Sequence, residues 1–234
     1  DPAFAYELAV IIQDGLNRMY CHQEDWIYYL TVMNETYEMP AMPDRPDVRE
    51  GILKGMYKFK PTSLKGAKAK VRAHLLGSGA ILNETLKAQA VLEKEYGVAA
   101  DVWSVTSYKE LYRDAVDVER WNLLHPDQEQ RTPYVSELLD GEDGVFVAAS
   151  DYMKVLPATV AQWFPRPLHA LGTDGFGRSD DRGPLRDFFE VDARYIAAAA
   201  LHRLADEGAV PAAKAKAVLK DLGIDPKKLN PHTD

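Results

Sequence analysis

Short apolar runs alternate with helical patterns over most of the chain. Four runs have the length and the apolar composition of buried strands: Val71–Leu76, Asp101–Thr106, Gly144–Ala149 and Leu168–Leu171. Segments with apolar residues at helical spacing separate them. Strands that alternate with helices are joined by right-handed crossovers into parallel sheets. The pattern therefore predicts an α/β fold, a three-layer sandwich around a mostly parallel sheet.

Capping and stop signals bound the predicted helices of this region. Ser107 and Glu110 form an S-x-x-E capping box, and Asp192 suits the cap of a long helix. Glycines are typical of helix ends because they adopt the left-handed conformation freely. The predicted helices run from Gly79 to Gly97, from Ser107 onward, over Met153–Trp163 and Pro184–Glu190, from Asp192 to Gly208, and from Pro211 to Gly223.

The amino-terminal part has a different pattern. Asp1 and Pro2 suit the start of a helix whose apolar face carries residues 8, 12, 16 and 19. Trp26–Met33 is almost entirely apolar or β-favouring, which is typical of a strand buried on both faces. One helix and one strand cannot make a domain. We therefore expect the remainder of this sheet to lie outside the chain and the apolar surface around Trp26–Met33 to be exposed.

A segment punctuated by prolines 40, 43 and 46 predicts an extended linker. We place a domain boundary there, which divides the chain into residues 1–43 and 44–234. Lys54–Phe59 is a candidate short strand, and Pro61–Lys70 is a basic loop that contains glycine.

Composition excludes several functional classes. The 234 residues carry a formal net charge of −8, which argues against a nucleic-acid partner. No apolar run approaches the roughly 20 residues that span a bilayer, so no membrane segment is expected. Cys21 is the only cysteine, so no intrachain disulfide is possible. These properties are typical of a cytoplasmic protein. Because the first residue is Asp1 and not Met, we expect a fragment of a longer protein.

Two predicted strands end in residues that suit a binding crevice. Gly77-Ser78-Gly79 has part of a dinucleotide fingerprint, but residue 82 is leucine and no acidic residue ends the next strand, so we favour a tight turn. Asp151 follows another strand. It either lines the carboxyl-end crevice or caps a helix together with Ser150, and we favour capping.

Asn34, Glu35 and Tyr37 follow the predicted Trp26–Met33 strand, at the end where active-site mouths form. They are candidates for a substrate channel, with an ordinary loop as the alternative. His125 precedes a proline in a loop and is the best histidine for a chemical role, although it could simply rigidify that loop. No histidine spacing suggests a metal site.

The segment from Leu171 to Asp180 places three glycines within six positions. Such a loop can turn sharply, with Phe176 as a buried anchor and Ser179 as the cap of the next helix. Arg131 and Arg178 could bind a carboxylate ligand, but we favour local ion pairs. We interpret the loop as structural, with its turn carried by Gly172, Asp174, Gly175, Phe176, Gly177 and Ser179.

Four segments together resemble the homodimeric bacterial pyruvate dehydrogenases, thiamin-diphosphate-dependent members of the transketolase superfamily. They are the opening D-P-A-F-A-Y-E, D-V-W-S-V-T-S at 101–107, E-R-W-N-L-L-H-P at 119–126 and L-G-T-D-G-F-G-R-S-D at 171–180. The resemblance covers essentially the whole chain and concerns the carboxyl-terminal part of these enzymes. It implies a transketolase-type C-terminal domain from about Asp44, preceded by a remnant of the pyrimidine-binding domain.

The resemblance also implies a reaction and partners. The intact enzyme would decarboxylate pyruvate and reductively acetylate the lipoyl group of the dihydrolipoamide acetyltransferase core, as a cytoplasmic homodimer. In the superfamily the end of the Trp26–Met33 strand faces the substrate channel. Relatives that use sugar phosphates have a cationic residue there, so Asn34 and Glu35 suit a substrate without phosphate.

The motif that holds Mg²⁺ and thiamin diphosphate in this family, G-D-G followed by N-N, is absent; the nearest strings lie at 140–144 and 173–175. We expect upstream domains to bind both groups, and this chain to contain no catalytic, cofactor-binding or metal residue. Its expected role is structural, in dimerisation and in the channel wall, and alone it should be inactive. Two alternatives stay open: a docking module for the acyltransferase or its lipoyl domain, and an independent nucleotide-binding α/β domain.

Overall fold

Five strands form one sheet in a computed structural model that describes residues 1–233, apart from the side chains of residues 67 and 68. The strand order is β1-β3-β2-β4-β5. Strands β2 to β5 pair in parallel, and β1 lies antiparallel to β3 at one edge. The predicted α/β fold with a mostly parallel sheet is confirmed. The strands are β1 (Met56–Lys60), β2 (Arg72–Gly77), β3 (Ala99–Val105), β4 (Val145–Ala149) and β5 (Leu168–Leu171).

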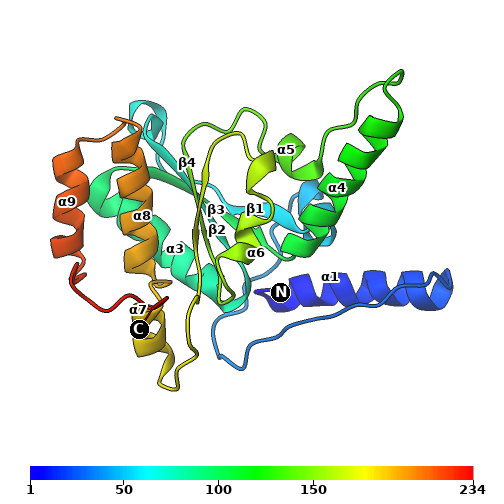
Figure 1. Cartoon of the computed structure of the whole chain (residues 1–234). Helices are drawn as coiled ribbons and strands as arrows, with labels where there is room; N and C mark the ends of the chain where they lie inside the picture. The colour runs from blue at the N-terminus through cyan, green and yellow to red at the C-terminus, as the bar shows by residue number, and fades with distance from the viewer. Residues whose placement is uncertain (234) are drawn as a thin grey trace.

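Helices cover both faces of the sheet (Figure 1). One layer contains α3 (Leu82–Val91) and α8 (Ala193–Asp206), with α9 (Ala212–Asp221) packed on α8. The other contains α4 (Tyr108–Leu124), α5 (Tyr134–Leu138) and α6 (Val155–Ala158). Neighbouring residues of a strand point to opposite faces, so Leu75 joins the core under α3 and α8, whereas Leu76 joins the core under α4. The remaining short helices are η2 (Gly66–Ala69), η3 (Gly79–Ile81), η4 (Leu92–Tyr96), η5 (Ala161–Trp163) and α7 (Arg182–Phe188).

The amino-terminal segment differs most from its prediction. Helix α1 (Ala5–Leu16) continues into η1 (Asn17–Cys21), and it begins after Phe4 instead of being capped by Asp1. The side chains expected on its buried face are largely exposed, with Leu16 59% accessible. Residues 26–33 form no strand, and Ile27 is 91% exposed. A lone strand cannot satisfy its backbone groups, and no strand among residues 1–233 lies beside it. The strand prediction is therefore wrong for this chain, while the expected exposed apolar surface is present.

Two further predictions need correction. The proline-rich linker contains a helix, α2 (Pro46–Lys54), in which Pro46 occupies the first position and Gly55 ends the helix with φ of 103°. The helix predicted over Met153–Trp163 is reduced to the short α6 and η5. By contrast, the predicted caps are observed: the Ser107 hydroxyl accepts from the Glu110 N–H, and the Asp192 carboxylate accepts from two N–H groups at the start of α8.

A buried hydroxyl at the start of α4 gives a test of the core. Tyr108 is 3% exposed, and no group among residues 1–233 hydrogen-bonds to its hydroxyl. An unsatisfied buried hydroxyl costs about 1–3 kcal/mol. We therefore expect Tyr108→Phe to raise the free energy of unfolding in urea by about 1 kcal/mol. Tyr57→Phe is the matched control, because the Tyr57 hydroxyl donates to Glu7 at 2.6 Å and its loss should destabilise the fold. Destabilisation by Tyr108→Phe would show that the hydroxyl has a partner.

Candidate functional site

Two of the four channel candidates, Asn34 and Glu35, lie at the carboxyl-terminal edge of the parallel strands. Both residues lie against α7 and beside Asp151, which lies two positions after β4. Together they border a small cavity of about 110 Å³. Its polar lining consists of Asn34, Glu35, Asp151, Arg182 and Arg186, and its apolar lining includes Met33, Ala80 and Leu185. This is the crevice in which open α/β sheets bind ligands.

An arginine clamp holds Asn34 and Glu35 in place. The Arg186 guanidinium donates to both Glu35 carboxylate oxygens, at 3.1 and 2.5 Å. Arg182 donates to the Asn34 carbonyl and amide oxygens at 3.1 and 2.6 Å. Arg186 also lies 3.5 Å from a Glu84 oxygen. Burial alone would lower the pKa of Arg186, but the hydrogen bonds that it donates to Glu35 and the charge of the surrounding carboxylates outweigh this effect and raise the pKa. The clamp joins segments about 150 residues apart in the sequence.

Asp151 is the remaining polar group in the cavity. Its carboxyl group is engaged by no hydrogen bond among the described residues, and burial raises its pKa while Arg186 and Arg182 oppose that rise. The capping interpretation is wrong, because α6 begins only at Val155 and the Ser150 hydroxyl, not Asp151, accepts from the Tyr152 N–H. Chemically, the site offers one acid of raised pKa beside two arginines that are already engaged by Glu35 and Asn34. Such an arrangement positions a chain segment better than it captures an anion.

The other two channel candidates lie outside the cavity. Tyr37 donates to the Ala3 carbonyl at 2.5 Å and packs on Phe4, so it anchors its segment to the residues that precede α1. His125 lies at the far end of α4, whose 17 residues extend about 25 Å from the carboxyl edge of β3. There it stacks on Trp121 at 4.5 Å and bonds to the Trp121 carbonyl at 2.8 Å. The structure therefore brings Asn34 and Glu35 together and places His125 elsewhere.

The glycine loop after β5 packs on neighbouring backbone. A Cβ at Gly172 would meet the Tyr152 carbonyl, and a Cβ at Gly175, which has φ of 98°, would meet the Pro231 carbonyl. The Asp174 carboxylate accepts from the Lys154 N–H at 3.2 Å, whereas Gly177 faces open space.

Two expectations about side chains of this loop are wrong, and so is the local ion pair expected for Arg131. Phe176 is 86% exposed and is not a buried anchor, because its flanking glycines carry it away from the core. Ser179 is not a helix cap, since α7 starts after Asp181. Arg131 lies 3.8 Å from the Trp121 centroid and forms no ion pair with the residues that the structure describes. Arg178 lies 4.0 Å from the Phe188 centroid.

The turn at Gly77-Ser78-Gly79 is covered by the start of the chain. The Gly79 N–H donates to the Asp1 carbonyl at 3.0 Å, and a Cβ on Gly79 would lie 2.8 Å from an Asp1 carboxylate oxygen. A dinucleotide diphosphate would need this N–H and this space. Asp1 therefore occupies the position that a nucleotide would take.

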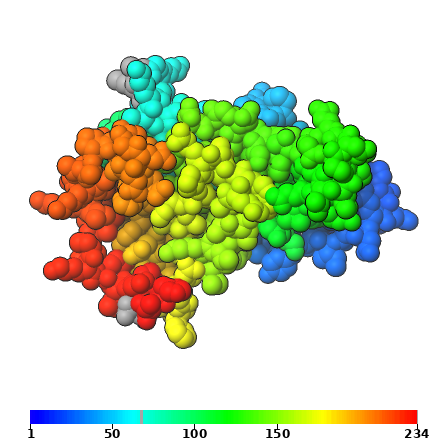
Figure 2. Space-filling view, turned by 45° about the horizontal axis from the view of Figure 1, so that its top comes forward, coloured from blue at the N-terminus to red at the C-terminus, as the bar shows by residue number. Residues whose placement is uncertain are grey.

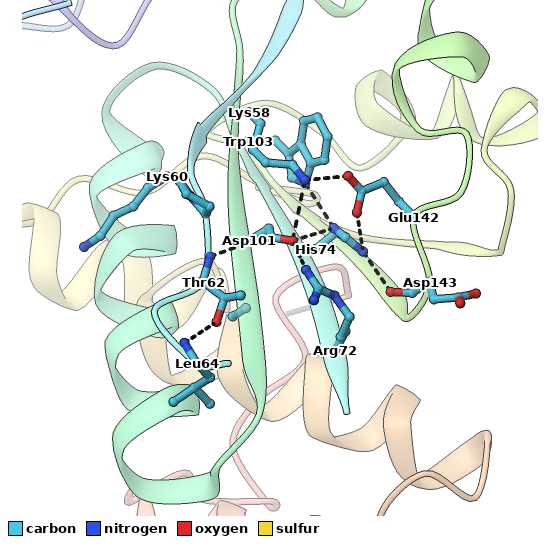
Figure 3. A network of polar contacts seen from close by, with 12 residues as sticks. Lys58, Lys60, Thr62, Leu64, Arg72, His74, Asp101, Trp103, Glu142 and Asp143 are labelled. Carbon is cyan, nitrogen blue, oxygen red and sulfur yellow. Dashed lines mark hydrogen bonds and ion pairs between the residues drawn. The ribbon is translucent and has the colours of Figure 1, made fainter. Parts of the chain in front are cut away.

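The opposite edge of the sheet holds a polar network that the sequence did not predict (Figure 3). His74, Asp101 and Glu142 gather within the reach of a metal ion. Two cationic side chains of the chain itself already pair with these carboxylates: Arg72 lies 2.7 Å from Asp101, and Lys58 lies 2.5 Å from Glu142. Mg²⁺ requires oxygen ligands in an octahedral arrangement, so a site with one imidazole and two bound cations does not fit it. Finding this network from the sequence would have required the strand register, since its members come from three strands and a loop.

The network predicts a pH dependence of stability. Trp103 donates to His74 Nδ1 at 3.2 Å, so Nε2 carries the proton and donates to the Asp143 carbonyl. Burial lowers the pKa of His74, and the same cause lowers that of His169. Below about pH 6.5 the unfolded chain therefore binds protons that the folded chain does not, and stability falls as the pH falls.

We expect the free energy of unfolding to fall by up to about 1.4 kcal/mol per pH unit for each histidine between pH 6.5 and its folded pKa. Urea unfolding at several pH values measures this slope. His74→Gln should flatten it, and His169→Gln should flatten it independently. An unchanged slope in the His74 variant would contradict the assignment of a neutral imidazole.

Comparison with known proteins defines the class of protein first. Residues 55–192 match the family model described as the transketolase-like TK C-terminal domain, and the chain belongs to this family. Residues 1–40 match the pyruvate dehydrogenase E1 component middle domain. A transketolase from Leishmania mexicana is similar over 68% of this chain and 19% of its own, with 17% identity and a TM-score of 0.45.

The particular relatives are pyruvate dehydrogenase E1 components. The chain is 49% identical to that of Pseudomonas aeruginosa over 99% of its length, which covers 26% of the relative. It is 48% identical to the Escherichia coli K12 component, of which it covers 25%. The chain thus corresponds to the carboxyl-terminal part of this enzyme component and spans about a quarter of the relatives it matches. Among residues 1–233, no helix combines the length and apolar character needed to cross a membrane.

Proposed function

We propose that this chain forms an architectural wall of pyruvate dehydrogenase, the oxidoreductase that decarboxylates pyruvate with thiamin diphosphate and Mg²⁺ and acetylates a lipoyl group. The observation that carries the proposal is the arginine clamp on Asn34 and Glu35. It fixes the end of the middle-domain segment against the C-terminal domain, where the substrate channel is expected. Cofactor and metal are bound by other domains in this proposal, and the protein is a cytoplasmic homodimer.

The proposed structural role is supported by the contacts between residues 1–43 and residues 44–234. We place the boundary between residues 43 and 44, yet the segment before it is hydrogen-bonded to the C-terminal domain through Asp1, Glu7 and Glu35. The arginine clamp fixes the channel mouth relative to the C-terminal domain. It does not contact the reacting atoms. The chain by itself is therefore a scaffold and has no decarboxylase activity.

Two assays test the proposal. The purified chain, supplied with pyruvate, thiamin diphosphate and Mg²⁺, should release no carbon dioxide above background. In the full-length enzyme, Asn34→Ala and Glu35→Gln should raise KM for pyruvate more than they lower kcat, because they displace a positioning segment. Unchanged pyruvate kinetics in both variants would remove Asn34 and Glu35 from the channel, and turnover by the chain alone would overturn the scaffold role.

The docking alternative, in which the domain binds the acyltransferase core or its lipoyl domain, is tested by a pull-down with those partners. The nucleotide-binding alternative is disfavoured by Asp1, which covers the Gly77–Gly79 turn. A thermal-shift measurement with dinucleotides tests it, because a ligand that binds the folded state raises the melting temperature.

A further inference from the structure

Positive charge is concentrated in one acid-free stretch of this acidic chain. Residues 51–83 contain seven lysines and arginines and no aspartate or glutamate. Because the whole chain carries −8 and this stretch carries +7, the remaining residues carry −15. The stretch includes the last residue of β1 and most of the connection to β2. We name residues 60–70 the basic loop. It lies at the amino-terminal edge of the parallel strands, away from the arginine clamp.

Three lysines of the basic loop differ from the neighbouring cations because they form no ion pair with a described residue. Lys58 and Arg72, at its two ends, are held by Asp101 and Glu142. In contrast, Lys60, Lys65 and Lys70 are exposed, and none forms an ion pair with any residue that the structure describes. Lys60 extends away from the polar network in Figure 3, and Figure 2 shows the loop, in cyan, projecting beyond its surroundings.

The stem of the basic loop is fixed. The Thr62 N–H donates to Asp101 at 2.7 Å, and the Thr62 and Ser63 hydroxyls both donate to Glu93. Gln89 donates to the Lys60 carbonyl at 3.3 Å. Burial would raise the pKa of Glu93, but these hydrogen bonds lower it and keep the carboxylate charged. The acidic groups near the loop are thus engaged at its base, which leaves its lysines for an external partner and reduces the cost of ordering the loop on binding.

We propose that the basic loop is a docking site for a short acidic segment of a partner polypeptide. Charge complementarity selects this partner, because three exposed lysines lie in a stretch of +7 within a chain whose other residues carry −15. A long polyanion such as nucleic acid, or an anionic membrane, would extend beyond the loop toward the remainder of this acidic chain and be repelled. A peptide segment with a few consecutive carboxylates contacts the loop alone. The docking site is independent of the proposed channel and does not require it.

The test measures binding of a fluorescein-labelled octaglutamate peptide to the full-length protein by fluorescence anisotropy. Charge reversal in the basic loop, Lys60→Glu with Lys65→Glu and Lys70→Glu, should weaken binding at least about tenfold, since each exposed pair contributes roughly a factor of two to five. The matched control reverses three exposed lysines on and after α9, Lys216→Glu, Lys220→Glu and Lys227→Glu, with the same change in net charge. It should leave the affinity within about twofold.

The wild-type affinity should also fall as NaCl is raised from low to physiological concentration, because exposed charge pairs are screened. An octaglutamine peptide should not bind. The proposal is overturned by no binding of octaglutamate at low salt, or by equal losses in the two triple variants. It is also overturned if an eight-residue oligothymidine or phosphatidylglycerol vesicles bind the loop as tightly as the peptide, which would indicate a general polyanion site.

Discussion

We expect Glu7→Ala to lower the free energy of unfolding by about 4 kcal/mol, as measured by urea denaturation. The Glu7 side chain is fully buried, and four groups donate to it. One oxygen accepts from the N–H groups of Ala3 and Phe4 at 2.6 and 3.1 Å. The other accepts from the hydroxyls of Tyr57 and Ser104, both at 2.6 Å. Truncation removes the acceptor of the Ala3, Phe4 and Ser104 donors, while the Tyr57 hydroxyl keeps the Tyr6 hydroxyl at 2.5 Å as its remaining neighbour.

The size of this effect follows from the cost of unpaired buried groups. Each donor that loses its partner costs about 1–3 kcal/mol, and relaxation or an entering water molecule recovers part of the sum. Glu7→Gln should cost less, about 2 kcal/mol, because one oxygen remains while the amide N–H₂ faces donors. Glu38→Ala is the control, since Glu38 is exposed and its loss should change stability by no more than about 0.5 kcal/mol. Equal effects at positions 7 and 38 would contradict the assigned role of Glu7.

Glu7 matters for function because of the elements that it joins. It lies on α1, in the segment that matches the middle domain, whereas its hydroxyl donors lie on β1 and β3 of the C-terminal domain. The same junction includes the Asp1 nitrogen, which donates to the Thr106 carbonyl at 2.7 Å. Together these contacts determine how the amino-terminal segment approaches the carboxyl edge of the sheet.

Elements governed by local chemistry could be predicted from the sequence. The buried runs 71–76, 144–149 and 168–171 are strands because they are short, apolar and bounded by glycine or polar residues. The caps at Ser107 and Asp192 are observed because a side-chain oxygen beside the first N–H groups of a helix requires only neighbouring residues.

Elements that depend on distant partners were missed. Trp26–Met33 has the composition of a buried strand, but a strand requires a neighbour, and pairing is a property of the whole fold. Helix α2 is a different case, because its start signal is local. The prolines before it favour a linker, although Pro46 followed by Asp47 is itself a helix-start signal.

The candidate site shows the same limit. The sequence predicts Asn34 and Glu35 at the end of a Trp26–Met33 strand, but that strand does not form; they lie instead at the carboxyl edge of the C-terminal domain's own sheet. Their partners Arg182 and Arg186 could not be predicted, since nothing local connects residues that far apart. Asp151 was assigned to a cap because Ser150-Asp151 has a cap-like composition, but the chain turns through residues 151–154 before α6 starts.

Arg186→Ala is expected to lower the free energy of unfolding by about 2–3 kcal/mol. The Arg186 and Glu35 side chains are only 12% and 22% exposed, so truncation removes the bidentate partner of a partly buried Glu35 carboxylate and one of the cations beside Glu84. Arg182, 3.6 Å from Glu35, and Lys87, 2.7 Å from Glu84, remain. This loss lies between those for buried and exposed ion pairs. Arg186→Lys should recover less than half, because an ammonium cannot donate to both Glu35 oxygens in the fork geometry of a guanidinium.

A double-mutant cycle isolates the clamp from the rest of the surface. Arg186→Ala and Glu35→Ala, alone and combined, should give a coupling energy of about 1–2 kcal/mol, since the two side chains contact each other directly. Arg203→Ala with Asp206→Ala is the matched control. This pair is also close, at 3.1 Å, but it is more exposed and should couple by no more than about 0.5 kcal/mol. Coupling between Arg186 and Glu35 as weak as that of the control would mean that this ion pair does not hold the segment before the domain boundary. The channel mouth would then lose the support that the proposal assigns to it.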